Sequence, residues 1–251
     1  MLIKYPPTCH MEGSRMPRGE NAAGQIPFAD CPGDFVAEEK LDGTQIGIKF
    51  DDDLSIKVQS RGHYVDLSDY EFQPLASWID VRQDMLFDRL GTARTLFAEW
   101  LYLKHTVFYD RLPSFLMEFD IFDENESSFL DTPRRHQILK GTDVRSVPVI
   151  TVQPLRDAIA ARSHILRSCY RSPGWRETLE QAATHRGQDP ALVLSQTDPT
   201  DYSEGLYLKQ ERDGRVVGRY KFVRAEFVNQ IVSSGSHWSS RAAIPNQEIA
   251  G

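Results

Sequence analysis

A lysine among carboxylates is the first group in this sequence whose surroundings suggest chemistry. In residues 37–48, AEEKLDGTQIGI, Lys40 follows Glu39 and precedes Asp42 and Gly43 in the pattern K-x-D-G. Nearby carboxylates make an amine, with its reference pKa of about 10.4, harder to deprotonate. Either Lys40 is one more charge on a solvated turn, or the carboxylates serve another partner while other groups tune the amine.

Five further motifs follow K-x-D-G in order along the chain. The four-residue pattern alone is common and is typical of an exposed turn, so the later motifs decide its meaning. They are SRG at 60–62, FAEW around Glu99, EFDIFD at 118–123, EGLYLK at 204–209 and RYKFVR at 219–224. Glu99 has apolar neighbours, which makes it a poor candidate for a solvated charge unless it lies on the solvent-exposed face of a strand.

Apolar periodicity predicts the elements that must position these motifs. Alternation over 44–60 predicts an antiparallel hairpin with one apolar face, and it places Leu54 in the second strand. Helical spacing of apolar residues up to Leu90, followed by Gly91, predicts a helix that ends there. Short aromatic-rich stretches are typical of strands, and two of them occur, at 95–103 and 113–123.

The second half of the chain continues with helices and closes with a hairpin. The predicted elements are a helix beginning at 131–133 and ending at Gly141, helices over 154–167 and 173–185, and a hairpin over 204–224 that turns at Asp213-Gly214. Strands at both ends with helices between them indicate an α+β fold of antiparallel sheets with flanking helices. Residues 1–34 are rich in Pro and Gly, so we expect an irregular N-terminal arm packed on a single domain over 35–251.

Composition is that of an ordinary soluble protein. The chain has 251 residues, of which 40% are hydrophobic and 26% charged. It has no apolar run near the roughly 20 residues of a membrane helix and no signal-peptide pattern, so we expect a cytoplasmic protein without membrane association. Three separated cysteines, Cys9, Cys31 and Cys169, indicate a reducing compartment, and without a C-x-x-C pair they disfavour a zinc site. The net charge of -7 argues against nonspecific nucleic-acid binding, so nucleic acid would have to bind at local basic patches.

In order and spacing, the six motifs resemble those of the covalent nucleotidyltransferase superfamily of ATP-dependent ligases and capping enzymes. Within it they are most similar to RNA ligases of the RNA ligase 2 type. The resemblance covers 40–224, and it extends to YPPTCHMEGSR at 5–15, EWLYLKHTVFYD at 99–110 and SGSHW at 234–238. It implies a nucleotidyltransferase domain of ATP-grasp-like architecture. For His10, in the first of these stretches, the sequence indicates no physical role.

The resemblance implies an ATP-dependent RNA ligase that joins RNA 3'-hydroxyl and 5'-phosphate ends, with RNA repair as its role. Lys40 would attack the α-phosphorus of ATP to form lysyl-AMP, AMP would pass to the RNA 5'-phosphate, and the RNA 3'-hydroxyl would displace it. Asp42, Glu99 and Glu204 are the matched carboxylates, expected to hold Mg²⁺ or Mn²⁺ through water, because hard cations prefer oxygen ligands. A bound cation would favour a neutral amine. The simpler interpretations are a turn residue for Asp42 and a hairpin-start residue for Glu204.

Nucleotide binding is implied for a second set of residues. Phe119 matches the aromatic residue that stacks on adenine, although a core phenylalanine is the simpler interpretation. Glu39 would contribute to the adenine-edge contact or remain a solvated charge. Arg61 would reach the ribose or the RNA-side phosphate, and Gly43 belongs to the nucleotide-binding K-x-D-G motif.

The resemblance implies that residues of the last two motifs neutralise the charge on the displaced phosphates. Lys209 and Lys221 would neutralise it, as preorganised cations do in phosphoryl transfer. The family usually has K-x-K in the last motif, whereas here Arg219 precedes Lys221, and an arginine keeps the charge but not the point geometry. Arg224 is a candidate RNA or phosphate contact or a plain surface arginine.

Two other classes of protein remain open. A capping-type guanylyltransferase shares K-x-D-G but carries GMP, and both that class and DNA ligases usually append an OB fold after the last motif. Here 27 residues follow Arg224, so we expect no C-terminal OB fold. That expectation favours a minimal ligase or one served by an end-healing or RNA-delivering partner protein. A nucleotide- or RNA-binding module without catalysis is the second alternative, and the full set of charged residues argues against it.

Overall fold

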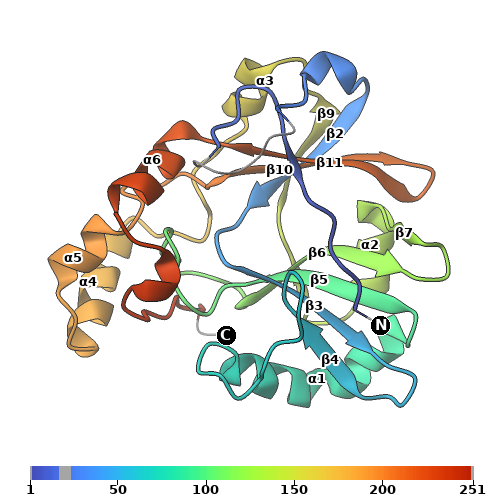
Figure 1. The fold of residues 1–251 in the computed structure, drawn as a ribbon, viewed down its shortest axis with the longest axis horizontal. Coiled ribbons are helices and arrows are strands. Elements are labelled where there is room, and N and C mark those ends of the chain that lie inside the picture. Colours follow the sequence, from blue (N-terminus) through green and yellow to red (C-terminus); the bar gives the residue numbers. More distant parts are fainter. Residues whose placement is uncertain (1, 17–23, 250–251) are drawn as a thin grey trace.

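Two β-sheets face each other across the centre of the molecule (Figure 1). The computed structural model describes residues 2–16 and 24–249. The first sheet has the strand order β1-β11-β10-β2-β9, and the second has the order β4-β3-β5-β6-β7 with β8 beside β6. Neighbouring strands run antiparallel, except that β1 is parallel to β11 and β8 is parallel to β6. The predicted α+β fold of antiparallel sheets with flanking helices is therefore confirmed.

The strands of each sheet and the helices have the following residue ranges. The first sheet consists of β1 (Cys9–His10), β2 (Asp34–Lys40), β9 (Val149–Pro154), β10 (Gly205–Arg212) and β11 (Arg215–Val223). The second sheet consists of β3 (Thr44–Phe50), β4 (Ile56–Gln59), β5 (Arg94–Trp100), β6 (Leu116–Asp123), β7 (Ser128–Phe129) and β8 (Arg145–Ser146). The helices are α1 (Gln73–Leu90), α2 (Thr132–Leu139), α3 (Ala158–Ser163), α4 (Trp175–His185), α5 (Pro190–Ser195) and α6 (Ala225–Ser233), with 3₁₀ turns η1 (Phe28–Asp30) and η2 (Trp238–Ser240).

Both predicted hairpins form. β3 and β4 make the first, and β10 and β11 make the second, which turns at Asp213-Gly214 with positive φ angles of 52° and 80°. Such angles suit the tight hairpin turns in which Gly and Asp are preferred. The placement of Leu54 in a strand is wrong, because this residue lies in the turn with a φ of 65° and its side chain is 54% exposed.

Helix predictions hold where capping residues mark the ends. α1 ends at Gly91, and α2 begins after Asp131, whose carboxylate accepts a hydrogen bond from the Arg134 main-chain N–H. The helix predicted over 154–167 is shorter in the structure, because β9 runs to Pro154 and α3 occupies only Ala158–Ser163. Of the helices in the described part of the chain, none is both long and apolar enough to cross a bilayer.

Apolar residues cover the outer faces of both sheets, and polar residues lie between the sheets. α1 packs its buried leucines on the outer face of the second sheet. On the first sheet, Leu206 and Leu208 of β10 point to an outer core near α3, whereas Tyr207 and Lys209 point toward the second sheet. Because successive side chains of a strand alternate between faces, the strand register selects the residues that reach the space between the sheets.

Candidate active site

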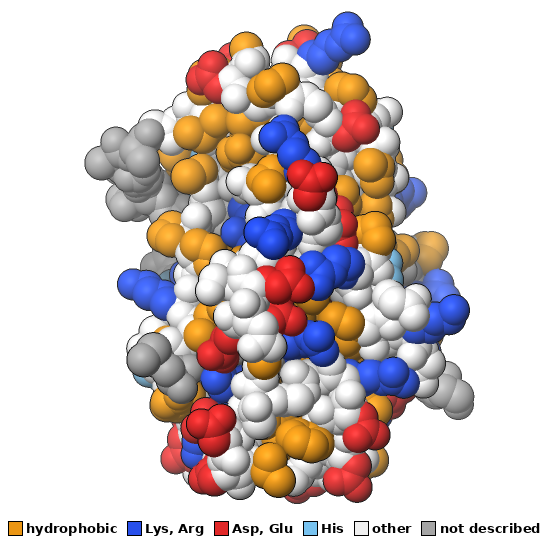
Figure 2. Space-filling view, turned by 90° about the vertical axis from the view of Figure 1, so that its right-hand side faces the viewer, with side chains coloured by type: hydrophobic (Ala, Val, Ile, Leu, Met, Phe, Trp, Pro, Cys, Tyr) orange, Lys and Arg blue, Asp and Glu red, His pale blue; other side chains and the backbone are white. Residues whose placement is uncertain are grey.

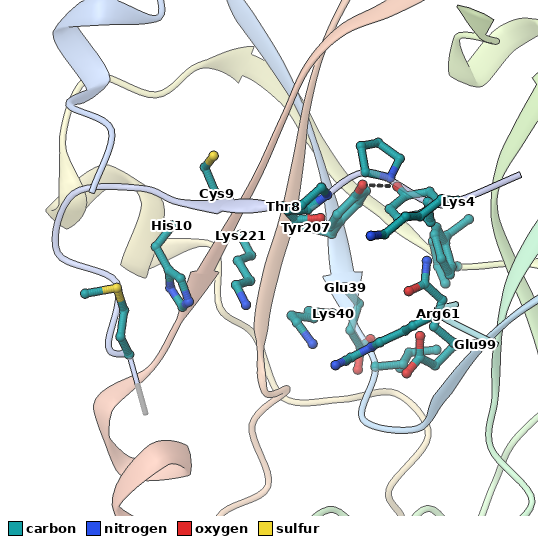
Figure 3. Close-up of a pocket in the computed structure, with 18 of the residues that line it drawn as sticks. Lys4, Thr8, Cys9, His10, Glu39, Lys40, Arg61, Glu99, Tyr207 and Lys221 are labelled. Atoms are coloured by element: carbon teal, nitrogen blue, oxygen red, sulfur yellow. Dashed lines mark hydrogen bonds between the residues drawn. The ribbon is translucent and has the colours of Figure 1, made fainter. Parts of the chain in front are cut away.

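A cavity of about 480 Å³ lies between the two sheets (Figure 3). This volume is within the usual range for small-molecule sites. Six residues predicted from the motifs line it together: Glu39, Lys40, Arg61, Glu99, Phe119 and Lys221. Residues 4–10 of the N-terminal arm form another part of the wall, for which the sequence predicted no role.

Lys40 is the last residue of β2, and its side chain reaches into this cavity. The Lys40 Nζ donates a hydrogen bond of 2.8 Å to the Glu204 Oε2, and Glu204 directly precedes β10, where Gly205 pairs with Lys40. Burial opposes the charge of the amine, but the attraction of Glu204, Glu99 and Asp42 outweighs it and raises the pKa of Lys40. Without a bound cation, the carboxylates therefore hold this lysine in its charged form.

Glu99 and Glu204 are carboxylates beside the amine with raised pKa values. Burial, followed by repulsion from the neighbouring acids, raises the pKa of each to about 7, although Lys40 lowers it. The Gly43 N–H donates to the Glu99 Oε1 at 3.0 Å, and a Cβ on Gly43 would lie 2.6 Å from the Trp100 carbonyl oxygen. Gly43 is therefore required for the close approach of the K-x-D-G turn to β5.

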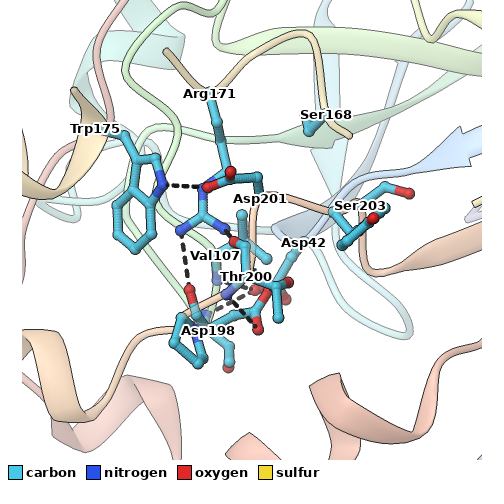
Figure 4. A network of polar contacts seen from close by, with 12 residues as sticks. Asp42, Val107, Ser168, Arg171, Trp175, Asp198, Thr200, Asp201 and Ser203 are labelled. Atoms are coloured by element: carbon cyan, nitrogen blue, oxygen red, sulfur yellow. Dashed lines mark hydrogen bonds and ion pairs between the residues drawn. The ribbon is translucent and has the colours of Figure 1, made fainter. Parts of the chain in front are cut away.

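Asp42 holds the segment that follows β5 against the K-x-D-G turn (Figure 4). Its Oδ2 accepts hydrogen bonds of 2.7 Å from the main-chain N–H groups of both Thr106 and Val107, and its own N–H donates to the Tyr109 hydroxyl at 2.9 Å. One oxygen of this predicted metal ligand is thus already occupied by two main-chain donors.

Arg224 is buried and belongs to a network with Ser203 and Asp198 rather than to the cavity lining. Its guanidinium donates to the Ser203 carbonyl oxygen at 2.7 Å and to the Asp198 carboxylate. Arg171 lies on the other side of Asp198, at 3.6 Å, and stacks over the Trp175 ring. The structure therefore places the Arg224 side chain in a support for the loop before β10, not at a phosphate.

Phe119 projects into the cavity because β6 contains a β-bulge at this position. Asp120 pairs with Phe97 and Glu118 pairs with Ala98, so Phe119 is the extra residue. Bulges bend a strand and change the direction in which a side chain points. The half-buried ring lines the cavity opposite Tyr207, with the ring centroids 5.9 Å apart. Phe119 thus lines the cavity and at the same time packs edge-on against Tyr5 and Tyr207.

Lys209 does not line the cavity. Its side chain is fully buried, and its Nζ lies 2.9 Å from Glu38 and 3.1 Å from Asp120 and donates to the Phe119 carbonyl oxygen. This differs from the expectation that the amine faces displaced phosphate. The physical reason is that the second sheet presents Asp120 directly opposite it.

The Arg219 side chain, like that of Lys209, contacts Asp120 and does not line the cavity. Its guanidinium lies 3.5 Å from Asp120 and 3.7 Å over the Phe129 ring. Arg219 and Lys221 are two residues apart and point to the same face of β11, but only Lys221 lines the cavity. The replacement of K-x-K by R-x-K therefore falls on a position that joins the sheets.

Arg135 of α2 completes this buried ionic network. Its guanidinium donates to Glu38 at 2.6 Å and to Glu118 at 2.7 Å, with all three side chains fully buried. Removing one member of such a group leaves an uncompensated buried charge, at a cost of about 3–5 kcal/mol. The network therefore holds the two sheets at the spacing that leaves the cavity open.

The Glu39 carboxylate lies on the face of β2 opposite to the Lys40 side chain, beside Ser168. Burial raises the pKa of Glu39 to about 7, and a hydrogen bond with Ser168 lowers it only in part. Alternation along the strand explains the position, because adjacent residues point to opposite faces. Glu39 borders the cavity and has its carboxylate beside Ser168.

Arg61 and Lys221 lie on opposite sides of Lys40. Figure 3 shows the Arg61 side chain extending from the second sheet toward Lys40, while Lys221 approaches from β11. Lys221 also acts electrostatically on Glu204, whose pKa it lowers slightly against the effect of burial. Both predicted phosphate or ribose contacts therefore reach the space next to the amine.

The carboxylates beside Lys40 suit a divalent cation by their chemistry. Two of them, Glu99 and Glu204, have pKa values raised by burial and by repulsion from neighbouring carboxylates, which a nearby positive charge would relieve. Within residues 2–16 and 24–249, no three His, Cys, Asp or Glu side chains converge closely enough to bind one ion directly. The carboxylates of Glu99 and Glu204 therefore fit a hard cation such as Mg²⁺ or Mn²⁺ by their oxygen donors.

Tyr5 and Tyr207 are residues of this site that the sequence reasoning missed. The Tyr5 hydroxyl donates to Asp120 and shares a hydrogen bond with the Tyr207 hydroxyl, and the Tyr5 ring packs edge-on against Phe119. For Tyr207 a signal existed, because the residue alternates with Lys209 in a strand pattern. Tyr5 begins the stretch at 5–15 that resembles the family, but its partners Asp120 and Tyr207 lie 115 and 202 residues away, so the local pattern did not indicate these contacts.

Comparisons with solved structures place the fold among ligases. The Naegleria gruberi RNA ligase with PPi matches at a TM-score of 0.52 and 17% identity, over 90% of this chain and 63% of that one. An archaeal ATP-dependent RNA ligase matches at 0.51 and 12% identity, over 89% of this chain and 49% of that one. A variant of the Naegleria gruberi enzyme with ATP and Mn matches at 0.50 and 15% identity, over 80% and 52%.

The two-sheet fold with a lysine in its central cavity is thus similar to the fold of nucleotide-dependent ligases. The sequence model of one protein family, RNA ligase, matches residues 33–223, and the chain belongs to the RNA ligase family. The chain spans about half to two-thirds of the length of the solved structures above. No curated protein matches it.

Proposed function

We propose that this chain is an ATP-dependent RNA ligase that joins RNA 3'-hydroxyl and 5'-phosphate ends through lysyl-AMP on Lys40 and an RNA-adenylate. The observation that carries the proposal is a single cavity lined by the Lys40 amine, the Glu99 carboxylate and the Phe119 ring. Membership of the RNA ligase family supports RNA as the strand that is joined. RNA repair is the proposed role.

The surroundings of Lys40 explain how its amine becomes a nucleophile. The largest effect on its pKa is burial, which lowers it, and only the attraction of the three carboxylates reverses the balance. A divalent cation held by Glu99 and Glu204 would cancel that attraction and polarise the α-phosphate. Burial would then dominate, lower the pKa of Lys40 and free the lone pair for attack.

The lining also suggests how the nucleotide lies. An adenine stacked on the Phe119 ring would place its ribose and α-phosphate toward Lys40, with Arg61 and Lys221 on either side. Stacking on an aromatic ring contributes about 1–3 kcal/mol per base. The two cations are preorganised for charge that develops on phosphate oxygens.

Binding of RNA must rely on local charge. The net charge is -7, and the face in Figure 2 shows Lys and Arg side chains interleaved with Asp and Glu rather than gathered in one basic area. Lys4 and Arg61 are exposed cations at the cavity and supply a local positive edge. We include in the proposal a partner protein that heals or delivers RNA ends, because this edge is small.

The test begins with labelling by α-labelled ATP and Mg²⁺. The protein should acquire label that is stable to base and labile to acid, as a phosphoramidate is. Labelling by GTP instead would indicate a capping-type guanylyltransferase, and labelling by neither would indicate a binding module. Ligation assays on nicked, gapped and single-stranded RNA and DNA then define the substrate, and joining of DNA alone would contradict the proposal.

A further inference from the structure

We propose that Gln59 is the latch of an N-terminal strap, residues 3–8, which must detach from the second sheet before a nucleotide enters or leaves the cavity. The proposal rests on the proposed function, because it concerns access to the same cavity. Figure 1 shows the dark blue start of the chain running from the first sheet across to the second.

The middle of the strap crosses the cavity between the two sheets. Every residue from Lys4 to Thr8 lines the cavity. Figure 3 shows Lys4 and Thr8 on one side of the cavity and Lys40 on the other. Pro6 and Pro7 have no main-chain N–H, so this part of the strap cannot pair with a strand through that group. A nucleotide in the cavity would therefore lie beneath a segment that is fastened toward its two ends.

The chain that follows the strap is anchored on the first sheet by a strand and by the core. Cys9 and His10 pair with β11, and the Met11 N–H donates to the Lys221 carbonyl oxygen at 3.0 Å. The Met11 side chain is fully buried in the outer core of this sheet. Loss of that burial would add to the loss of the main-chain bonds. We therefore take this end as the hinge about which the strap moves.

The other end of the strap is held on the second sheet by the side chain of Gln59. The Ile3 N–H donates to the Gln59 Oε1 at 3.2 Å, and the Gln59 Nε2 donates to the Ile3 carbonyl oxygen at 2.5 Å. A main-chain N–H only donates and a carbonyl only accepts, so Ile3 fixes the orientation of this amide. Gln59 is only 2% exposed, ends β4 and does not line the cavity. Its amide can therefore be changed without removing a group that faces the nucleotide.

Tyr5 connects the latch to the proposed base site. Its ring packs edge-on against Phe119, with the centroids 5.6 Å apart, and its hydroxyl donates to Asp120 of the same strand, β6. When Ile3 leaves Gln59, Tyr5 is two residues from the released end and can leave Phe119 with it. The strap therefore closes the cavity at the end where the adenine is proposed to stack.

A latch outside the cavity changes the rates of binding rather than the affinity. Gln59 holds the strap in the empty cavity and in the occupied cavity alike, so a weaker latch raises the open fraction of both forms. Association and dissociation then accelerate by the same factor, and Kd is unchanged. Loss of a direct nucleotide contact would instead accelerate dissociation and raise Kd.

The experiment follows binding of a ribose-labelled fluorescent α,β-methylene ATP to the full chain by stopped flow. Its bridging carbon is not displaced by Lys40, so binding is observed without adenylation. Gln59→Leu keeps the size of the side chain but loses both hydrogen bonds. Both rate constants should rise by about 10-fold, while Kd changes by less than about 3-fold. Gln83→Leu, at an exposed position of α1, is the matched control and should bind as wild type does.

A second variant breaks the latch from the strap side. Ile3→Pro removes the N–H that Gln59 accepts and leaves β4 untouched, so both rate constants should again rise together. Hydrogen exchange of the same proteins should show faster exchange of the amides within residues 3–8, while β11 exchanges as in wild type.

The outcomes separate the latch from other roles of Gln59. The proposal is overturned if dissociation accelerates and association does not, or if neither rate constant changes. If Gln59→Leu also disturbs exchange in β11, the rates of Ile3→Pro decide by the same criterion. Failure of the wild-type chain to bind the ATP analogue would instead contradict the proposed function itself.

Discussion

A hydrogen bond of 2.8 Å from the Lys40 Nζ to the Glu204 Oε2 joins the end of β2 to the residue before β10. The two residues are 164 positions apart in the chain. Their strands are neighbours in the first sheet, so the contact follows from the pairing of Lys40 with Gly205. This contact places the charged amine directly on one of the carboxylates proposed to organise the metal.

Lys40→Ala should abolish covalent labelling by α-labelled ATP, because no other residue in the proposed reaction supplies the attacking nitrogen. The free energy of unfolding should change by less than about 2 kcal/mol, since Glu204, whose pKa is raised to about 7, can take up a proton when its partner is lost. Gel labelling and urea denaturation measure the two effects. Lys140→Ala, at an exposed site after α2, is the control. Residual labelling of the Lys40 variant would place the nucleophile elsewhere.

Lys209→Met should mainly reduce stability, whereas Lys221→Met should mainly reduce adenylation. The Lys209 amine is buried between Glu38 and Asp120, so its loss should lower the free energy of unfolding by about 3–5 kcal/mol. Lys221 lines the cavity, so its loss should reduce lysyl-AMP formation while stability changes by no more than about 1 kcal/mol. Thermal unfolding and adenylation rates measured on both variants check this. Equal stability in the two would show that Lys209 does not join the sheets.

Phe119→Ala should raise the ATP concentration required for half-maximal adenylation by about 10- to 100-fold, the range expected for loss of one stacking contact. Joining of pre-adenylated RNA at saturation should change less. The control is Phe122→Ala. This variant removes a half-buried ring of β6, the strand that contains Phe119, and this ring packs on Phe129 of β7. If the ATP dependence of the Phe119 variant matches that of wild type, this ring is a core residue.

Glu39→Gln should stabilise the protein in a pH-dependent manner. The pKa of Glu39 is raised by burial from 4.5 to about 7, so the native state retains a proton that the unfolded state releases between these values. The stability of the wild type therefore falls as pH rises through this window. Glutamine cannot ionise, so the variant should gain up to about 3 kcal/mol above pH 7 and nothing near pH 4.5.

Urea denaturation of the Glu39 variant at pH 5 and pH 8 measures this difference. Glu180→Gln, at an exposed position of α4, should show no gain at either pH. A gain of equal size at both values would mean that the carboxylate of Glu39 does not titrate in this range.

Local patterns in the sequence were sufficient for several of the elements and for the location of the K-x-D-G motif. Alternation located β3, β4, β10 and β11, and the capping residue Asp131 located the start of α2. These signals are reliable because they depend on neighbours within a few residues. The same alternation, applied to β2, separates Lys40 from Glu39, which explains why the Glu39 carboxylate lies on the other face.

Only the tertiary structure decided which of the inward-facing cations serve the cavity. Lys209, Arg219 and Lys221 all point to the same face of the first sheet, and the sequence pattern treats them alike. Asp120 of the second sheet takes Lys209 and Arg219 into an ionic network and leaves Lys221 to the cavity. The choice depends on contacts between segments about 90 to 100 residues apart, where the sheets meet. Periodicity along one strand carries no information about the residues that face it across such a space.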